Sequence, residues 1–501
     1  MDGSGSGKSA SYSIPNAYQC LGSYIFTDPK GELYDRTAGY LKEQGYEIKV
    51  LNLVRPQYSD GYNPLMHISS ELDVDVIANT IVKGQKTESS SDPYWDDMAE
   101  MLLKALIYYL IATRPEEEQN LASCAELVRA ANKNGGSNLL SDLMSQLPYD
   151  HPARMYYKSI EIAPEKTYGS ILSSLQSKLG KFDSKEIAEL TSTDTIDFEE
   201  IGSKKTAVYV ISSDTHTAYD FLLTIFFSQM IQQLYDYADQ NGGRLKEQTF
   251  FILDEFANIG KIPDFDKKIS TSRSRKISFS VILQNIDQLE AVYEKSYETI
   301  MGNCDTHVFL GSNSFKTVEY FSKQLGETTI VRDTKSTNRD KNFSKQGYST
   351  SDQIMGRALM TPDELRRMDN DLCIIFEKGL KPIKANKYYY FTKPTMNRRL
   401  NQERLDHNNF DAGVRGEWRK FNPQNPYADS TDKPEQDLKV ESLDDLFEDD
   451  VKPITPPTPQ AQPKASENVK KQEEAPVLPM EDNTREDELF SKDLQVELEA
   501  K

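Results

Sequence analysis

A glycine-rich loop followed by a basic and a hydroxyl side chain opens the sequence. It consists of Gly3, Ser4, Gly5, Ser6, Gly7, Lys8 and Ser9, and we call it the phosphate loop. A loop of this kind before a helix turns successive backbone N–H groups toward a phosphate, and the positive end of the helix adds to the attraction. Lys8 suits the β- and γ-phosphates of a nucleotide, and the Ser9 hydroxyl suits a Mg²⁺ ion. The segment predicts a site for ATP and Mg²⁺; a flexible Gly/Ser stretch is the alternative.

The phosphate loop departs from the full G-x-x-x-x-G-K-[ST] pattern at one position. The first glycine of that pattern falls on position 2, where the sequence has Asp2. Its negative charge near phosphates, together with the lack of a strand signal ahead of the loop, predicts weak or absent ATP turnover by this chain.

Two adjacent carboxylates, Asp254 and Glu255, follow the apolar run 249–253. An apolar strand that ends in two acids is the Walker B arrangement. In it Asp254 holds the Mg²⁺ shell, and Glu255 orients and deprotonates an attacking water. Solvated acids at a strand end are the alternative for this motif alone. Together with the phosphate loop it indicates a motor ATPase rather than a kinase for small metabolites.

Two further polar positions flank the next expected strand, 277–283. Gln284 follows the strand, at the carboxyl edge where a γ-phosphate is expected, so its amide suits phosphate sensing. Arg273 precedes the strand within the basic run 272–276 and is a candidate arginine finger for a neighbouring subunit, which implies a ring. A plain strand-end amide and a solvated turn remain the alternatives.

The elements that would position these residues predict an α/β fold. Strand and helix signals alternate over residues 1–92, helical periodicity without a convincing strand fills 93–200, and strands resume over 201–395. We therefore expect a RecA-like nucleotide-binding domain in two parts, 1–92 and 201–395, with an all-α domain inserted at 93–200. Expected strands lie at 24–27, 47–51, 205–211, 249–253, 277–283, 306–310, 372–376 and 384–391.

Residues 396–501 are expected to form a linker and a disordered acidic tail. Residues 429–501 carry 21 acidic and 9 basic side chains and cluster their prolines at 453–463. Such a segment cannot bury enough apolar surface to offset its ordering entropy. The short apolar islands 443–447 and 487–490 are read as solvated tail, with docking helices as the alternative.

Charge and cysteine content restrict the class of protein. The net charge of −20 makes the whole molecule repel nucleic acid, so any contact with DNA needs a local basic surface. The four cysteines are far apart and form no C-x-x-C pair, which favours reduced thiols of the cytosol. The most apolar helical run, 101–112, is too short to span a membrane and contains Lys104.

The motifs, taken in order, resemble those of the type IV secretion coupling proteins, the TraG-type ATPases of conjugative DNA transfer. The resemblance covers roughly residues 3–395 and is most specific at residues 28–32, Asp-Pro-Lys-Gly-Glu, which other phosphate-loop proteins have no reason to carry. The other matching segments are the phosphate loop, 253–260, 272–275, Gln284 with 288–293, and 303–306.

This resemblance implies a RecA-like, ATP-driven hexamer at the cytoplasmic face of the bacterial cell membrane. It implies that the motor receives a relaxase bound to single-stranded DNA and drives transfer through a type IV secretion channel, with the all-α domain helping to recognise the DNA-processing proteins. The matching positions imply Walker A roles for Lys8 and Ser9, Walker B roles for Asp254 and Glu255, an arginine finger at Arg273 and phosphate sensing at Gln284. Family members begin with membrane-spanning helices and a strand before the phosphate loop, so we expect this chain to be N-terminally truncated.

Two alternatives remain open at this point. An FtsK/HerA-type DNA translocase shares the phosphate loop, the acid pair and the arginine finger, but it does not account for the 28–32 motif or the helical insertion. A non-catalytic receptor that docks relaxase or secreted proteins would account for a damaged phosphate loop, but not for an intact acid pair. DNA binding is inferred from the resemblance, because the basic clusters are short and no stacking pattern accompanies them.

Overall fold

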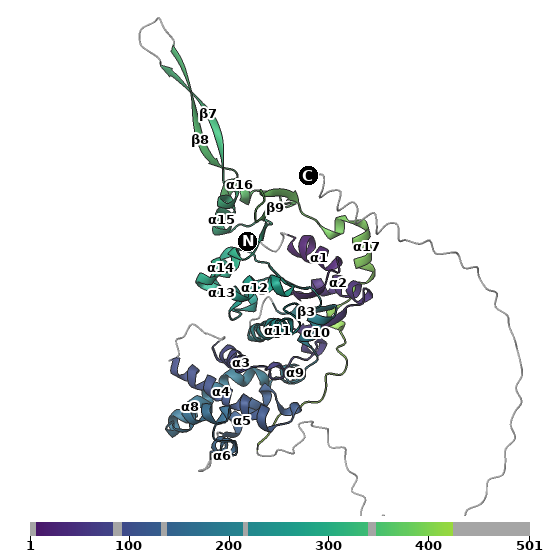
Figure 1. The fold of residues 1–501 in the computed structure, drawn as a ribbon, viewed down its shortest axis with the longest axis vertical. Helices are drawn as coiled ribbons and strands as arrows, with labels where there is room; N and C mark the ends of the chain where they lie inside the picture. Colours follow the sequence, from purple (N-terminus) through teal and green to yellow (C-terminus); the bar gives the residue numbers. More distant parts are fainter. Residues whose placement is uncertain (1–6, 84–92, 132–137, 214–218, 339–346, 424–501) are drawn as a thin grey trace, which may run out of the picture. The chain divides into compact units, whose positions relative to one another are not determined.

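The computed structural model of the chain describes residues 7–83, 93–131, 138–213, 219–338 and 347–423 (Figure 1). These residues belong to one compact unit, 1–432. Residues 3–6 of the phosphate loop and the acidic tail lie outside the described residues, so the expectations for them stay predictions. Among the described helices, none is both long and apolar enough to cross a membrane.

A five-stranded parallel sheet forms the centre of the fold, in the order β2-β3-β1-β4-β5. Its register aligns the carboxyl ends of three neighbouring strands, because Thr27 pairs with Leu253 and Leu253 pairs with Val281. The residues that follow these three strands therefore meet at one edge of the sheet. The strands are β1 (Ser23–Thr27), β2 (Glu47–Asn52), β3 (Thr206–Ile211), β4 (Thr249–Leu253) and β5 (Ile277–Val281).

Helices cover both faces of this sheet, which explains why its strands are continuously apolar. Alternate side chains of β1 point into different cores: Tyr24 and Phe26 pack with α1, α2 and α17, whereas Ile25 packs with the core that includes α11. This arrangement confirms the predicted α/β class. The covering helices are α1 (Ile14–Tyr18), α2 (Glu32–Glu43), α11 (Asp220–Gln240) and α17 (Pro394–Gln402).

An all-helical region separates β2 from β3, as predicted, and the described residues of that stretch contain no strand. Its first helix, α3, packs against both α4 and α11, which joins the region to the body that carries the sheet. The predicted boundaries at 93 and 200 stay predictions. The helices are α3 (Glu71–Lys83), α4 (Pro93–Thr113), α5 (Leu121–Ala131), α6 (Leu139–Ser145), α7 (Pro152–Glu161), α8 (Glu165–Leu179), α9 (Lys185–Leu190) and α10 (Phe198–Ser203).

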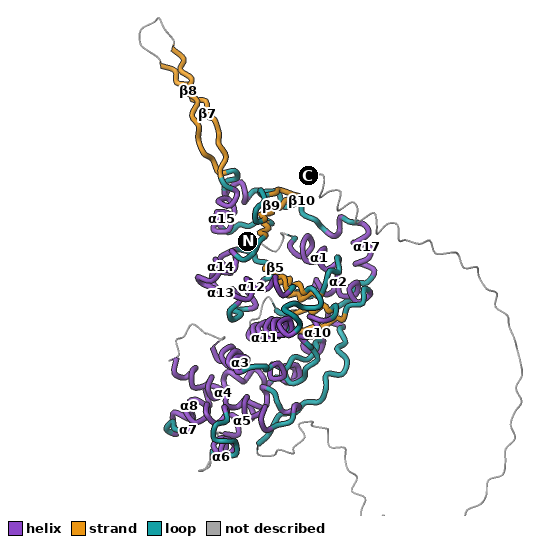
Figure 2. Tube along the Cα trace, in the orientation of Figure 1, coloured by secondary structure: helices purple, strands orange, loops and turns teal. Residues whose placement is uncertain are grey.

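The remaining strands form two antiparallel sheets, shown with the central sheet in Figure 2. One is a three-stranded sheet in the order β10-β9-β6, and the other is a long two-stranded ribbon made of β7 and β8. Their bounds are β6 (Thr306–Phe309), β7 (Glu327–Asn338), β8 (Gly347–Ala358), β9 (Leu372–Glu377) and β10 (Ile383–Asn386). The helices of this part are α12 (Phe265–Thr271), α13 (Ile286–Tyr293), α14 (Tyr297–Gly302), α15 (Phe315–Leu325) and α16 (Pro362–Arg366).

Two expectations for this part were wrong or incomplete. The predicted strand at 384–391 ends at Asn386: residues 387–389 have no regular secondary structure, and Tyr390–Thr392 form a short 3₁₀ helix that places Tyr390 in a hydrophobic core. The ribbon of β7 and β8 was not predicted, since its sequence is polar and lacks the apolar alternation of a half-buried strand.

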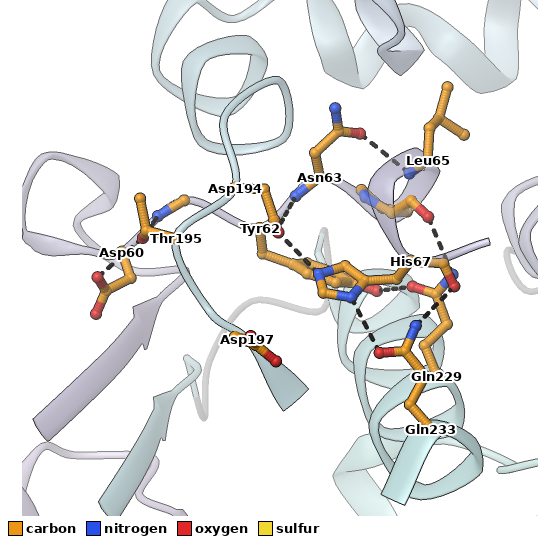
Figure 3. A network of polar contacts seen from close by, with 12 residues as sticks. Asp60, Tyr62, Asn63, Leu65, His67, Asp194, Thr195, Asp197, Gln229 and Gln233 are labelled. Atoms are coloured by element: carbon orange, nitrogen blue, oxygen red, sulfur yellow. Dashed lines mark hydrogen bonds and ion pairs between the residues drawn. The ribbon is translucent and has the colours of Figure 1, made fainter. Parts of the chain in front are cut away.

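A buried polar network ties the two connections of the helical region to α11 (Figure 3). The His67 ring lies between Asp194 and Gln233, with Nε2 2.9 Å from the Asp194 carboxylate. Gln229, which is 1% exposed, accepts a hydrogen bond from the Tyr62 hydroxyl at 2.5 Å. Its amide also donates to the carbonyl oxygens of Pro64 and His67. Residues 62–67, which precede α3, and Asp194, which lies between α9 and α10, are thereby linked to one helix of the central body.

Replacing Gln229 with leucine tests this anchoring. The change leaves the buried Tyr62 hydroxyl without its acceptor and removes the donor to two carbonyl oxygens, so we expect a loss of about 1–3 kcal/mol in the free energy of unfolding. Urea denaturation followed by circular dichroism measures it. Gln240→Ala, an exposed position on the same helix, is the control and is expected to change stability by less than about 0.5 kcal/mol. Equal denaturation midpoints for Gln229→Leu and the unmodified chain would contradict the anchoring role.

Candidate functional site

The described part of the phosphate loop leads directly into a helical segment. Gly7 has a φ of +70°, a left-handed conformation that favours glycine, and its carbonyl oxygen accepts hydrogen bonds from both the backbone and the side chain of Ser11. The π-helical turn η1 (Ser9–Ser13) follows and continues into α1. The helix start predicted after the loop is therefore present, and its amino end is at Lys8 and Ser9.

Lys8 lies between the two carboxylates that the sequence singled out. Its ammonium nitrogen is 2.9 Å from Glu255 Oε1 and 3.7 Å from Asp254 Oδ1. The side chains of Lys8, Glu255 and Asp254 are only 10%, 20% and 12% exposed, so solvent screens the attraction between the lysine and the two acids weakly. Two motifs separated by 247 residues thus form one charged cluster at the carboxyl edge of the sheet.

Ser9 adds a hydroxyl to this cluster, because its Oγ donates to Asp254 Oδ2 at 3.3 Å. A hydroxyl and a carboxylate oxygen facing each other are hard ligands of the type that Mg²⁺ prefers. Burial is the largest effect on Asp254 and raises the pKa of its carboxyl, while the positive charge of Lys8 lowers it. The residues present therefore fit a divalent cation, whose charge would favour ionised Asp254 further.

Glu255 occupies a sharp turn at the end of β4. It has a φ of +50° and a ψ of +44°, a left-handed conformation that a residue with a β-carbon rarely adopts and that costs about 1 kcal/mol or more. The neighbouring backbone holds this turn, because the N–H of Phe256 donates to the Ile282 carbonyl at 3.1 Å. The conformation directs the Glu255 carboxylate back toward Lys8.

Gln284 completes the cluster from the end of β5. Its amide nitrogen donates to both carboxylate oxygens of Glu255, at 2.9 and 3.0 Å. Lys8 and Gln284 thus share one carboxylate, and a change at either partner is transmitted to the acid. The geometry suits an acid whose orientation depends on what lies in the phosphate loop.

The 28–32 motif shapes the adjacent strand end. Asp28 is 3% exposed, and its carboxylate accepts the backbone N–H of Tyr34 at 2.8 Å, which stabilises the first turn of α2. Gly31 has a φ of +71°, and a β-carbon there would lie 2.4 Å from the His407 ring, so a side chain cannot be accommodated. Just before the motif, the Thr27 hydroxyl donates to the carbonyl oxygen of Asp254 at 2.6 Å. The motif positions β1 and α2 beside the acid pair.

Arg273 is the one predicted site residue in the described part of the chain that lies away from the cluster. It is in the 3₁₀ turn η7 (Ser272–Arg275), before β5, whereas Gln284 follows β5. Arg273 and Gln284 are therefore at opposite ends of β5, whose five residues span about 17 Å. The Arg273 side chain is 93% exposed, with Asp305 as a distant ion-pair partner at 3.8 Å.

Arg275, in the same turn, makes contacts within its own chain instead. Its guanidinium makes two hydrogen bonds to the Asp239 carboxylate, at 3.0 and 3.1 Å, and lies 4.8 Å from the centre of the Tyr235 ring. Arg275 therefore holds η7 against α11. Of the two arginines, only Arg273 is oriented toward solvent and available to another molecule.

Sequence reasoning missed two contacts of this site. The hydrogen bond from Thr27 to Asp254 was not predicted, because a threonine at a strand end is common. Tyr389, which contacts Gly7, follows β10 in a run of four aromatic residues, 388–391. The sequence predicts a strand over 384–391 that includes this run, and only the fold brings the run to the phosphate loop.

The chain matches the family model described as "Type IV secretory system Conjugative DNA transfer" over residues 1–411. It is 25% identical over 431 residues to the conjugal transfer protein TraG of Escherichia coli, with 79% of this chain and 67% of TraG covered. The chain spans 67%, 64% and 61% of the length of three curated relatives that it matches.

Solved structures show a similar fold. The bacterial conjugative coupling protein TrwBdeltaN70, in a trigonal form with sulphate, superposes with a TM-score of 0.56 at 15% identity, covering 77% of this chain and 83% of that one. The plasmid coupling protein TrwB in complex with the non-hydrolysable ATP analogue ADPNP superposes with a TM-score of 0.50 at 14% identity, covering 74% and 86%.

Removing the positive charge of Lys8 should destabilise the site. In Lys8→Met the carboxylates of Asp254 and Glu255 lose their cation and repel each other, so we expect the free energy of unfolding at pH 8 to fall by about 1–3 kcal/mol. The double variant Lys8→Met/Glu255→Gln should recover most of this loss, because it removes one of the two negative charges. Thermal denaturation at low ionic strength measures both. A double variant no more stable than Lys8→Met would contradict the pairing.

Asp28 predicts a distinct dependence of stability on pH. Burial raises the pKa of Asp28 to about 7, whereas an aspartate in the unfolded chain has a pKa of about 3.9. Between these values the folded chain retains a proton that the unfolded chain releases, so the contribution of Asp28 to stability is full below about pH 4 and is lost as the pH rises through 7.

Asp28→Asn removes this titration. We expect the stability of the variant relative to the unmodified chain to increase between pH 5 and pH 8, as measured by urea unfolding at both values. A stability difference that is the same at the two pH values would show that Asp28 is ionised throughout.

Proposed function

The chain belongs to the family of type IV secretory system proteins of conjugative DNA transfer, and from this premise we propose that it is the ATP-hydrolysing coupling protein of such a system. Residues 3–9 bind the phosphates of ATP, and hydrolysis drives relaxase-bound single-stranded DNA into the secretion channel. A solved structure of TrwB with an ATP analogue, and the fold shared with it, support this proposal.

One observation carries the proposal: the Lys8 ammonium lies 2.9 Å from the Glu255 carboxylate and 3.7 Å from Asp254. A lysine at the amino end of a helix and two acids at the end of a neighbouring strand are the groups that a nucleoside triphosphate and its metal require. A chance Gly/Ser stretch would have no reason to fold against the acid pair.

Each residue of the cluster has a role in this proposal. Ser9 and Asp254 hold Mg²⁺, which supplies neutralising charge for the phosphates. Lys8 exchanges Glu255 for the β- and γ-phosphates, and this exchange frees the Glu255 carboxylate to accept a proton from the attacking water. Gln284 keeps its hydrogen bonds to Glu255 and senses whether the terminal phosphate is present.

Arg273 acts on the nucleotide of a neighbouring subunit. Its exposed side chain is at the opposite end of β5 from Gln284, so it does not reach the site of its own chain. An arginine that is useful only to a neighbour implies a ring, for which we propose a homo-hexamer. The ring is placed at the cytoplasmic face of the cell membrane, where the inserted helices receive the relaxase.

ATP turnover with and without single-stranded DNA tests the motor function. We expect turnover to increase with DNA, and Lys8→Ala and Glu255→Gln each to reduce it about 100-fold or more, because they remove the phosphate contact and the general base. Asp2 predicts a slow basal rate, so the DNA-dependent increase is the decisive quantity. Turnover that survives both substitutions would contradict the proposed site, and relaxase binding without any turnover would favour a docking receptor.

Mixing two inactive variants tests the arginine finger. Arg273→Ala keeps Glu255, and Glu255→Gln keeps Arg273, so a mixed ring contains sites with both groups supplied by different subunits. We expect each variant alone to be inactive and the mixture to regain a measurable fraction of turnover. A mixture as inactive as its components would contradict action between subunits.

Arg275→Ala is the matched control for Arg273→Ala. Because Arg275 pairs with Asp239 in its own chain, we expect Arg275→Ala to lower the stability of the chain. Mixing Arg275→Ala with Glu255→Gln should give no more turnover than Arg275→Ala gives alone.

A further inference from the structure

An aromatic side chain lies directly against the phosphate loop. A β-carbon built on Gly7 would be 2.7 Å from Cε1 of Tyr389 and 3.3 Å from its hydroxyl oxygen, so the ring contacts the backbone of the residue that precedes Lys8. Tyr389 comes from the segment after β10, more than 380 positions later in the chain. This contact has no part in the roles assigned above.

Tyr389 is half of a stacked aromatic pair. Its ring and that of Phe391 have centroids 5.0 Å apart and planes inclined by 20°, and the Phe391 side chain is 52% exposed. The two rings, which we call the aromatic platform, therefore present apolar surface to solvent beside an anion-binding loop. A single exposed phenylalanine needs no explanation, but a stacked pair at this place does.

The aromatic platform is held rigidly. Tyr390 lies between Tyr389 and Phe391 in the sequence; it is 9% exposed and packs in the core shared with α1 and α2. On the other side, the Lys387 ammonium donates to the Leu310 carbonyl oxygen at 2.8 Å. The 3₁₀ turn η9 (Tyr390–Thr392) contacts η1, the turn that follows the phosphate loop. The chain reaches α17 by way of this turn (Figure 2).

The position of the aromatic platform matches what the remainder of a nucleotide requires. When the phosphates of a nucleotide occupy the loop, its sugar and base must extend away from Lys8 along neighbouring surface. The half-buried Tyr389 ring beside Gly7 and the exposed Phe391 ring stacked on it supply such a surface. Stacking of a base on an aromatic side chain contributes about 1–3 kcal/mol and needs no hydrogen bond to the base.

We propose that Tyr389 and Phe391 form the platform on which the purine base of the nucleotide stacks. This inference rests on the proposed function, since the phosphate loop must hold the phosphates for the base to arrive there. Stacking recognises the flat face of a base and not its edge. ATP and GTP therefore bind with similar affinity, and CTP, whose smaller ring covers less of the platform, binds more weakly.

A comparison of two ligands tests the proposal. Binding of Mg-ATP and of Mg-tripolyphosphate, which has the phosphates but no base, is measured by calorimetry for the whole chain and its variants. Tyr389→Ala and Phe391→Ala should weaken ATP binding by about 5- to 100-fold and leave tripolyphosphate binding within about twofold. Tyr389→Phe keeps the ring and should retain ATP binding. Tyr149→Ala, a 72% exposed tyrosine of the helical region, is the control.

Each outcome decides the proposal. If Tyr389→Ala weakens both ligands equally, the ring only supports the phosphate loop and the platform is refuted. If neither ligand is weakened, no base stacks on these rings. Tripolyphosphate binding that depends on Lys8 would preserve the proposed function even when the platform fails. A chain that binds neither ligand would overturn both.

Discussion

The structure depends on a pair of poorly solvated carboxylates that require a cation. Asp254 and Glu255 follow β4 at an edge where little water reaches them, and burial, followed by the negative charge of Glu255, raises the pKa of Asp254. Lys8 supplies the cation, and it can do so because α1, which follows η1, packs on the sheet against β1 and β4 and so holds Lys8 near the end of β4. The left-handed turn at Glu255 and the aligned ends of β1, β4 and β5 bring the two acids, Lys8 and Gln284 into contact.

The rest of the fold constrains that site from both sides. Thr27 and Asp28 fix β1 and α2 beside Asp254 through backbone hydrogen bonds, while Gln284 reaches Glu255 from β5. The network around Gln229 fastens the inserted helices to α11, which packs on the opposite face of the sheet. A substrate held by the helical region would thus act on the same body that carries the acid pair.

Much of this was predictable because local chemistry and strand pattern agree. Asp254, Glu255 and Gln284 follow apolar runs, and in a parallel sheet the ends of neighbouring strands share an edge. What the sequence could not predict depends on distant contacts. The ribbon of β7 and β8 has polar strands without alternation, β6 pairs with β9 and not with the central sheet, and Tyr389 reaches Gly7 only through the path of the folded chain. The two arginines of η7 look alike in sequence, and only their surroundings distinguish them.

The most direct test of the central claim is the binding of ATP to the chain by calorimetry, with Mg²⁺ and with EDTA. If Lys8, Ser9 and Asp254 form one nucleotide site, the chain binds one ATP. Binding should weaken at least about tenfold without Mg²⁺, in Lys8→Met and in Asp254→Asn. Equal affinity in all of these conditions would show that ATP binds elsewhere and that the charge cluster is only structural.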